Sequence, residues 1–259
     1  MRNSFSTNVL LLVLTLGVFG QAAAQEASIV GPRVDGILRR MSDLLAESPS
    51  FAFKAEEIVD EVLDSGFKAE LSHIRTIALR RPDGVVTNVD GDSAHRSAWF
   101  DGKTLTVLDR QHNRYAVLDA NRDIDEMLDF VADEFDVVFP LADILHSDIY
   151  ASLTAGAEYT SYLGIHQVED IPCHHLAFAN EWLEWQLWVD AEGPPLPRKL
   201  TITYMDEPGE PKYTARFLSW NLSPELDDDL FVFEVPEGAH EMEPWSFTPS
   251  ADSGQEKNR

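Results

Sequence analysis

Most of this chain alternates apolar and polar residues with a period of two, which is the spacing of side chains along a β-strand. Near the start of the pattern, Phe51, Phe53 and Ala55 fall on one side of an extended chain. Lys54 and Glu56 fall on the other side. Similar runs follow at about 67–80, 84–90, 93–100, 103–109 and 112–118. The pattern therefore predicts a succession of strands.

Turn sequences separate these runs and indicate how the strands connect. Asp-Gly pairs occur at positions 83–84, 90–91 and 101–102, and such a pair between alternating runs is typical of a β-hairpin. Because no helical segment interrupts the first six runs, we expect them to form an antiparallel meander. A second series of runs lies at about 157–168, 171–179, 182–190, 197–205, 211–221 and 230–235.

Two segments have the three- and four-residue apolar spacing of amphipathic helices. The first covers residues 32–48 and ends at Pro49, and the second covers residues 124–135, between the two series of strands. A shorter helix is predicted at 140–146. A sheet of about eleven strands twists until it curls or closes. We therefore expect a mainly β fold with some α: a curled antiparallel half-barrel with helices covering its concave side.

Residues 1–24 have the three parts of a secretory signal peptide. Arg2 supplies a positive charge, residues 9–19 form an apolar core, and residues 22–24 are alanines that suit cleavage. The apolar core is shorter than the roughly 20 residues that a transmembrane helix needs. We expect a periplasmic protein that is not an integral membrane protein, with secretion as the alternative. Residues 25–245 are expected to form one domain, and residues 246–259 a disordered polar tail.

The charge and the cysteine content exclude several classes of function. The chain has 45 acidic and 20 basic residues, a formal net charge of −25. A surface this negative repels nucleic-acid phosphates, so no nucleic-acid partner is expected. The single cysteine excludes an intramolecular disulfide and any multi-cysteine metal site.

Cys173, His174 and His175 are the residues that could carry chemistry. Adjacent residues of a strand point to opposite faces, so the two histidines could hold zinc only with further ligands such as His166 or Glu184. We expect Cys173 to be buried and inert. A hydrolase that uses Cys173 or a histidine-centred metal is the disfavoured alternative. No nucleophile elbow, H-E-x-x-H, Gly-rich nucleotide motif or EF-hand loop occurs, so we expect no catalytic residues, no metal and no cofactor.

The order of several short segments resembles a known superfamily. WFDGKTL at 99–105 precedes the helical insertion, and DDLFVF at 228–233 follows the last long strands. This arrangement resembles the LolA/LolB-like lipoprotein-carrier superfamily, in which a curled sheet and a helical lid enclose a cavity for acyl chains. IPCHHL at 171–176 and PRKL at 197–200 resemble a bacterial family of predicted periplasmic proteins whose function is not established. The resemblance implies a non-enzymatic protein that binds an apolar ligand, and Arg96 as the cavity arginine.

The candidate ligand-binding residues come from the apolar sides of the predicted strands and from this resemblance. They are Arg96, Trp99, Leu105, Val107, Tyr115, Trp185, Leu187, Ile202 and Tyr204. Met127, Leu128 and Val131 of the second helix are expected to form the lid. The expected partner is a lipid, a lipoprotein or another apolar ligand. The alternative is a periplasmic sensor or regulatory module on the same fold, whose acidic surface would dock a basic protein partner.

Overall fold

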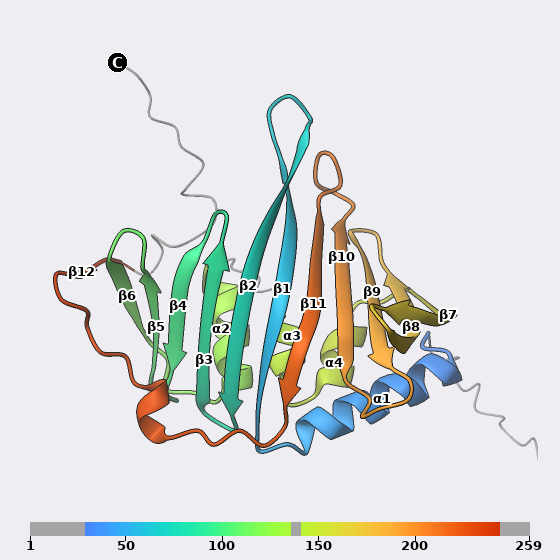
Figure 1. The fold of residues 1–259 in the computed structure, drawn as a ribbon, viewed down its shortest axis with the longest axis horizontal. Helices are drawn as coiled ribbons and strands as arrows, with labels where there is room; N and C mark the ends of the chain where they lie inside the picture. The colour runs from blue at the N-terminus through green and yellow to red at the C-terminus, as the bar shows by residue number, and fades with distance from the viewer. Residues whose placement is uncertain (1–28, 136–140, 244–259) are drawn as a thin grey trace, which may run out of the picture.

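The computed structural model describes residues 29–135 and 141–243, and the fold centres on one large sheet (Figure 1). The expected signal peptide at 1–24 and the expected tail at 246–259 lie outside the described residues. Within the described part, the sheet contains twelve strands. These are β1 (Ser50–Val62), β2 (Lys68–Arg80), β3 (Gly84–Gly91), β4 (His95–Phe100), β5 (Thr104–Asp109), β6 (Arg114–Asp119), β7 (Tyr159–Val168), β8 (Ile171–Ala179), β9 (Leu183–Asp190), β10 (Pro197–Tyr204), β11 (Lys212–Asn221) and β12 (His240–Glu241).

The sheet joins two meanders edge to edge. The strand order is β12-β6-β5-β4-β3-β2-β1-β11-β10-β9-β8-β7, so each meander keeps its sequence order. The meanders meet where β1 pairs with β11, with Glu57 opposite Ala215. All neighbouring strands are antiparallel except β12, which pairs with β6 in parallel. Because β6 and β7 lie near opposite edges of the sheet, the chain between them must cross the sheet.

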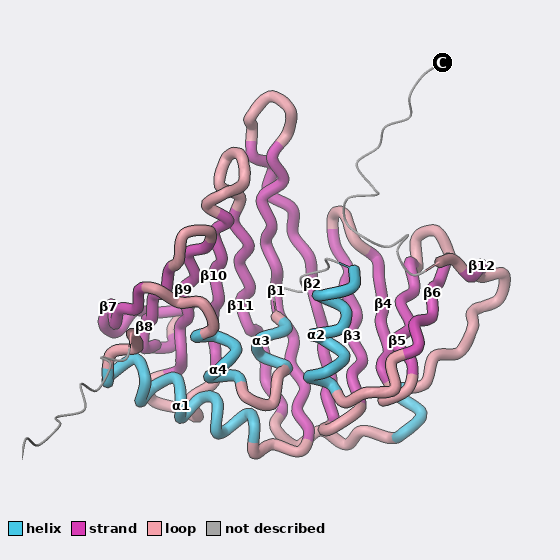
Figure 2. Tube along the Cα trace, turned by 180° about the vertical axis from the view of Figure 1, so that it is seen from behind, coloured by secondary structure: helices cyan, strands magenta, loops and turns pink. Residues whose placement is uncertain are grey.

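The crossing segment carries the helices that cover the concave face (Figure 2). They are α2 (Ile124–Phe135), α3 (Ala142–Leu145) and α4 (Ile149–Thr154). Pro140, at which the predicted short helix began, lies outside the described residues. The expected fold class, a mainly β curled sheet with helices on its concave side, is confirmed.

Helix α1 (Pro32–Ala46) runs along the lower ends of the second meander in Figure 1. Pro32 suits the first helical turn, where no backbone N–H is needed, and the helix ends before Pro49. Its apolar stripe is buried at Val34, Ile37, Leu38, Met41 and Leu45. Each such side chain contributes about 1.5–3 kcal/mol when fully buried. Helix α4 is attached to α1, because the Tyr150 hydroxyl donates to Asp35 at 2.7 Å and the Tyr150 amide donates to Ser42 at 3.0 Å.

One expectation at the level of elements is wrong, and one short helix was not predicted. The strand predicted at 230–235 is replaced by a 3₁₀ turn at Asp228–Phe231 and an irregular segment. Phe233 of this segment contacts the sheet, where it packs on Trp99 and Tyr115 with ring centroids 5.2 Å away in both cases. Helix α4 was not predicted, because six residues are too few to show a helical period. Asp148 caps α4 by accepting a hydrogen bond from the Ala151 amide at 2.9 Å.

Candidate functional site

A cavity of about 460 Å³, called here the main cavity, lies between the concave face of the sheet and helices α2 and α3. Its sheet side is mostly apolar and includes Ile77, Val85, Ala98, Phe100, Leu105 and Val107 from the first meander. Leu183, Ile202 and Tyr204 contribute from the second meander. Its helical side includes Met127, Leu128, Val131, Ala132, Ala142 and Leu145. A cavity of this volume and apolar character is typical of small-molecule sites.

The helices leave space above the concave face of the sheet because only part of the apolar stripe of α2 is buried. Of the apolar stripe of α2, Ile124 and Met127 are buried, whereas Leu128 and Val131 are half-buried and line the main cavity. Alanines at positions 98, 132 and 142 also line it, and their small side chains leave volume that larger residues would occupy.

A smaller cavity of about 260 Å³, called here the side cavity, adjoins the main cavity. Both are lined by Asp143, Ser152, Leu183 and Ile202, so the two spaces share a wall. Trp185 lines the side cavity, stacks on Phe178 with a centroid distance of 5.5 Å and donates its indole N–H to the Leu153 carbonyl at 3.1 Å.

The structure brings seven of the predicted site residues to the main cavity. They are Leu105, Val107, Ile202 and Tyr204 on the sheet, and Met127, Leu128 and Val131 on α2. Trp185 borders the side cavity instead. Leu187 lies on the same face of β9 but is fully buried in the core and borders neither space.

Trp99 and Tyr115 do not line the main cavity. The β4–β5 hairpin pairs Trp99 with Thr106, and the β5–β6 hairpin pairs Tyr115 with Leu108. Directly opposite residues share a face, so both aromatic rings lie on the convex face, away from Leu105. The sequence pattern gave the parity within each strand but not the register between strands, which decides the face.

Arg96 shares the concave face of β4 with Ala98 and Phe100, but it lies outside the main cavity. It is the second residue of β4, and the register places it opposite Asp109 of β5. Arg75 of β2 reaches the cavity lining instead, because it donates to the hydroxyl of Thr87, a lining residue, at 3.3 Å.

Arg75 belongs to a buried polar cluster that sequence reasoning missed. Its Nε donates to Glu57 at 2.6 Å, and the Tyr213 hydroxyl donates to the same Glu57 oxygen at 2.7 Å. Glu57 is only 3% exposed. Burial, with the Glu57 carboxylate second, raises the pKa of Tyr213 well above its usual value. The signal was present in the sequence, because Glu57 continues the inward series of Phe51, Phe53 and Ala55.

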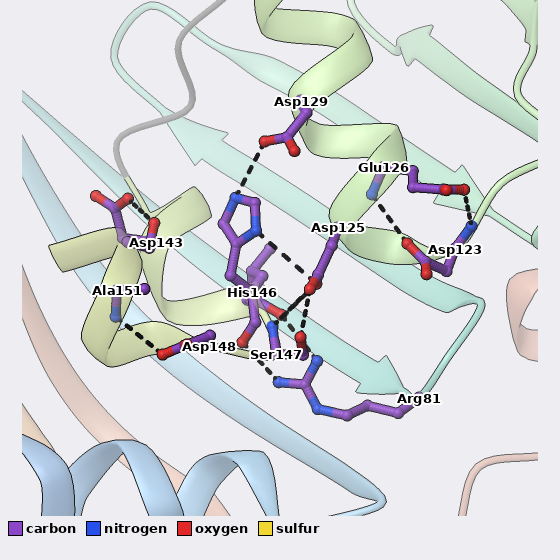
Figure 3. Close-up of polar contacts among 12 residues, drawn as sticks. Arg81, Asp123, Asp125, Glu126, Asp129, Asp143, His146, Ser147, Asp148 and Ala151 are labelled. Carbon is purple, nitrogen blue, oxygen red and sulfur yellow. Dashed lines mark hydrogen bonds and ion pairs between the residues drawn. The ribbon is translucent and has the colours of Figure 1, made fainter. Parts of the chain in front are cut away.

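Polar contacts attach helix α2 to the segment between α3 and α4 (Figure 3). Asp125 accepts a hydrogen bond from the Ser147 amide at 2.9 Å and another from the Ser147 hydroxyl. The His146 imidazole lies between Asp125 and Asp129, at 3.8 Å and 3.9 Å. Arg81 donates to the carbonyls of Leu145 and His146, at 3.2 Å and 2.9 Å. Burial lowers the pKa of the Arg81 guanidinium, and Asp125 opposes that shift.

Cys173, His174 and His175 do not form one site. His174 accompanies Tyr162 on the concave side, with Nδ1 3.2 Å from the Tyr162 hydroxyl, whereas His175 stacks on Trp188 on the other face. His175 also contacts His166, with 2.7 Å between the two Nδ1 atoms. Burial lowers the pKa of both His174 and His175. Cys173 is buried, and burial raises the pKa of its thiol from 9.0 to about 11.

No group of three or more His, Cys, Asp or Glu side chains lies close enough together in the described part of the chain to hold a metal ion. Of the helices within residues 29–135 and 141–243, none has the length and apolar character that crossing a membrane requires.

Fold and cavity together define a class of protein: a curled, mainly antiparallel sheet that holds an apolar cavity beneath a helical cover. The chain belongs to the family described as "Predicted periplasmic protein (DUF2092)", whose model matches residues 35–243. This match confirms the expected family and the expected periplasmic location. No curated protein sequence matches the chain.

Solved structures resemble the fold at low sequence identity. An uncharacterized conserved protein from Thermus thermophilus is 10% identical with a TM-score of 0.48, and the match covers 82% of this chain and 99% of that one. A LolA superfamily protein from Nitrosomonas europaea is 12% identical with a TM-score of 0.40, over 77% and 97% of the two chains. The lipoprotein LppX from Mycobacterium tuberculosis is 11% identical with a TM-score of 0.42, over 76% and 99%.

Proposed function

We propose that this protein is a non-enzymatic periplasmic carrier that binds an acyl chain of a lipid or lipoprotein in the main cavity. The observation that carries the proposal is the cavity itself: about 460 Å³ of space between apolar strands and the apolar stripe of α2. The sequence resemblance to lipoprotein carriers agrees with this use of the fold.

The energetics of an apolar cavity suit a carrier that must also release its ligand. Each buried methylene contributes about 0.8 kcal/mol, so a chain of roughly twelve gains about 10 kcal/mol. Association costs about 4–15 kcal/mol in lost freedom. At the smallest association cost the net gain is about 6 kcal/mol, so a single chain binds with a dissociation constant of roughly tens of micromolar or weaker, which shields it from water and still permits transfer.

The test combines two measurements on protein purified from the periplasm. Mass spectrometry of an organic extract identifies bound lipids, and a fluorescent acyl probe measures binding in solution. The double variant Ala98→Leu/Val107→Phe places larger side chains in the main cavity. We expect it to weaken probe binding at least tenfold while the protein stays folded.

The matched control is Val117→Phe. Val117 is opposite Thr106 and so lies on the convex face of β6, where extra volume does not enter the main cavity. We expect wild-type binding from this control. An empty extract together with no probe uptake by the wild-type protein would reject the proposal.

A further inference from the structure

We propose that the main cavity selects acyl ligands whose headgroup is uncharged or cationic and discriminates against anionic headgroups. This inference rests on the proposed function, because it assumes that an acyl chain occupies the cavity. It specifies the chemical class of the ligand from the charges that surround the cavity.

Two aspartates line the main cavity, Asp129 of α2 and Asp143 of α3, and His146 lies beside them. The Asp129 side chain is 72% exposed, so Asp129 marks a place where the cavity meets solvent. The polar end of an inserted chain stays at such a place, because moving a headgroup into the apolar interior is costly. The headgroup would therefore lie beside a carboxylate.

Asp143 reinforces this selection. It accepts a hydrogen bond from the Ser152 hydroxyl at 2.5 Å, and both residues line the main cavity and the side cavity. A carboxylate accepts hydrogen bonds and repels other anions, whereas hydroxyls, amides and ammonium groups can donate to it. A glycerol hydroxyl, an amide N–H or a cationic amine thus has acceptors at the cavity, and a fatty-acid carboxylate does not gain from them.

The basic side chains around the main cavity already have partners within the protein. The His146 imidazole lies within 4 Å of both Asp125 and Asp129. Arg81 donates to the carbonyls of residues 145 and 146, and Arg75 is paired with Glu57 at 2.6 Å. An anionic headgroup would have to compete with these contacts to be neutralised.

The remaining charges of the helical cover have the same sign. Besides Asp129 and Asp143, residues 124–135 and 141–154 include five Asp or Glu and no Lys or Arg. Arg122, next to the start of α2, is placed over the Phe130 ring at 3.9 Å. Because salt screens exposed charges, the lining carboxylates Asp129 and Asp143 dominate the local field, which has the same negative sign as the net charge of −25 for the whole chain.

The test compares three ligands with the same twelve-carbon chain: laurate, monolauroylglycerol and dodecyltrimethylammonium. Each is used below its critical micelle concentration to displace the neutral probe N-phenyl-1-naphthylamine from the full-length protein. We expect laurate to bind at least tenfold more weakly than monolauroylglycerol, and the cationic ligand at least as tightly. In Asp129→Asn/Asp143→Asn, laurate should come within about threefold of monolauroylglycerol, since asparagine keeps an acceptor for Ser152 and removes the charge.

The control Asp133→Asn/Glu134→Gln removes the same charge from exposed positions of α2 that do not line the cavity. It should keep the wild-type discrimination, and a cooperative thermal transition close to that of the wild type verifies that both double variants are folded. Equal binding of laurate by the wild type would overturn the inference and leave the proposed function standing. Restoration of laurate binding by the control variant would also overturn it, because overall charge would then be the cause. Failure of all three ligands to displace the probe would reject the inference and the proposed function together.

Discussion

At the residue scale, Glu57 illustrates how a buried charge depends on its partners. Its carboxylate accepts hydrogen bonds from Arg75 and from the Tyr213 hydroxyl, and Glu57 is only 3% exposed. Removing one member of a buried ion pair leaves the other charge uncompensated, which costs about 3–5 kcal/mol. We predict that Glu57→Gln lowers the free energy of unfolding by about 3 kcal/mol in urea titrations. Glu61→Gln, at an exposed position of the same strand, should change it by less than about 0.5 kcal/mol. A loss as small in Glu57→Gln as in this control would contradict the role of the cluster.

Cys173 provides a chemical measure of burial, because it is the single cysteine in the chain. Burial raises the pKa of its thiol from 9.0 to about 11, so at pH 8 the thiolate is about a hundredfold scarcer than in the unfolded chain. We predict that a thiol-specific reagent labels native protein at least a hundredfold more slowly than protein in denaturant. Labelling of native protein at a rate within tenfold of the unfolded rate would show that the thiol is accessible and reactive.

The Asp190 carboxylate makes the stability of the fold depend on pH. Burial alone would raise its pKa, but hydrogen bonds from the Gly193 amide at 2.7 Å and from Arg198 at 2.8 Å outweigh this effect and lower the pKa below 3.8. A lowered pKa contributes stability that is present above the unfolded value and is lost as pH falls through the folded value. We predict that Asp190→Asn costs about 1–3 kcal/mol at pH 7. The gap between wild type and variant in urea titrations should narrow below about pH 4; a gap that does not depend on pH would exclude the charge as its source.

At the scale of elements, helix α2 is anchored near its N-terminal end by polar contacts, in addition to the burial of Ile124 and Met127. Asp125 accepts two hydrogen bonds from Ser147, one of them from the amide at 2.9 Å, and each such bond contributes about 0.5–1.5 kcal/mol. We predict that Asp125→Ala raises amide hydrogen exchange in residues 124–135 by about tenfold and leaves the sheet unchanged. Asp133→Ala, at an exposed position of the same helix, is the control and should have little effect. Equal exchange in the two variants would show that Ser147 does not anchor the helix.

The elements also show which parts of the molecule the sequence determines locally. The two meanders, their hairpin turns and helices α1 and α2 were predictable, because alternation, Asp-Gly turns and helical spacing are local signals. The pairing of β1 with β11 was not, since it joins residues about 160 positions apart, such as Glu57 and Ala215. The register between strands was also not predictable, so Trp99 and Tyr115 were predicted on the wrong face of the sheet. For Leu105 and Ile202, the alternation within their own strands was sufficient, and both line the main cavity.

At the scale of the whole molecule, the main cavity connects parts of the chain that are distant in sequence. Val107 belongs to the first meander, Met127 to helix α2 and Ile202 to the second meander, and all three line the main cavity. A ligand that contacts all three parts binds the folded protein and not the unfolded chain, so it stabilises the whole fold by mass action.

We therefore predict that monolauroylglycerol raises the melting temperature of the wild-type protein in proportion to the logarithm of its concentration. At 100 times its dissociation constant the gain is about 2.7 kcal/mol. For a domain of 150–250 residues this corresponds to a shift of roughly 5–10 °C, measurable by calorimetry as one cooperative transition. Ala98→Leu/Val107→Phe should melt at or above the wild-type temperature without ligand, because filling a cavity adds contacts, and should gain little from the ligand. A ligand-induced shift in this variant as large as in the wild type would place the binding site elsewhere on the molecule.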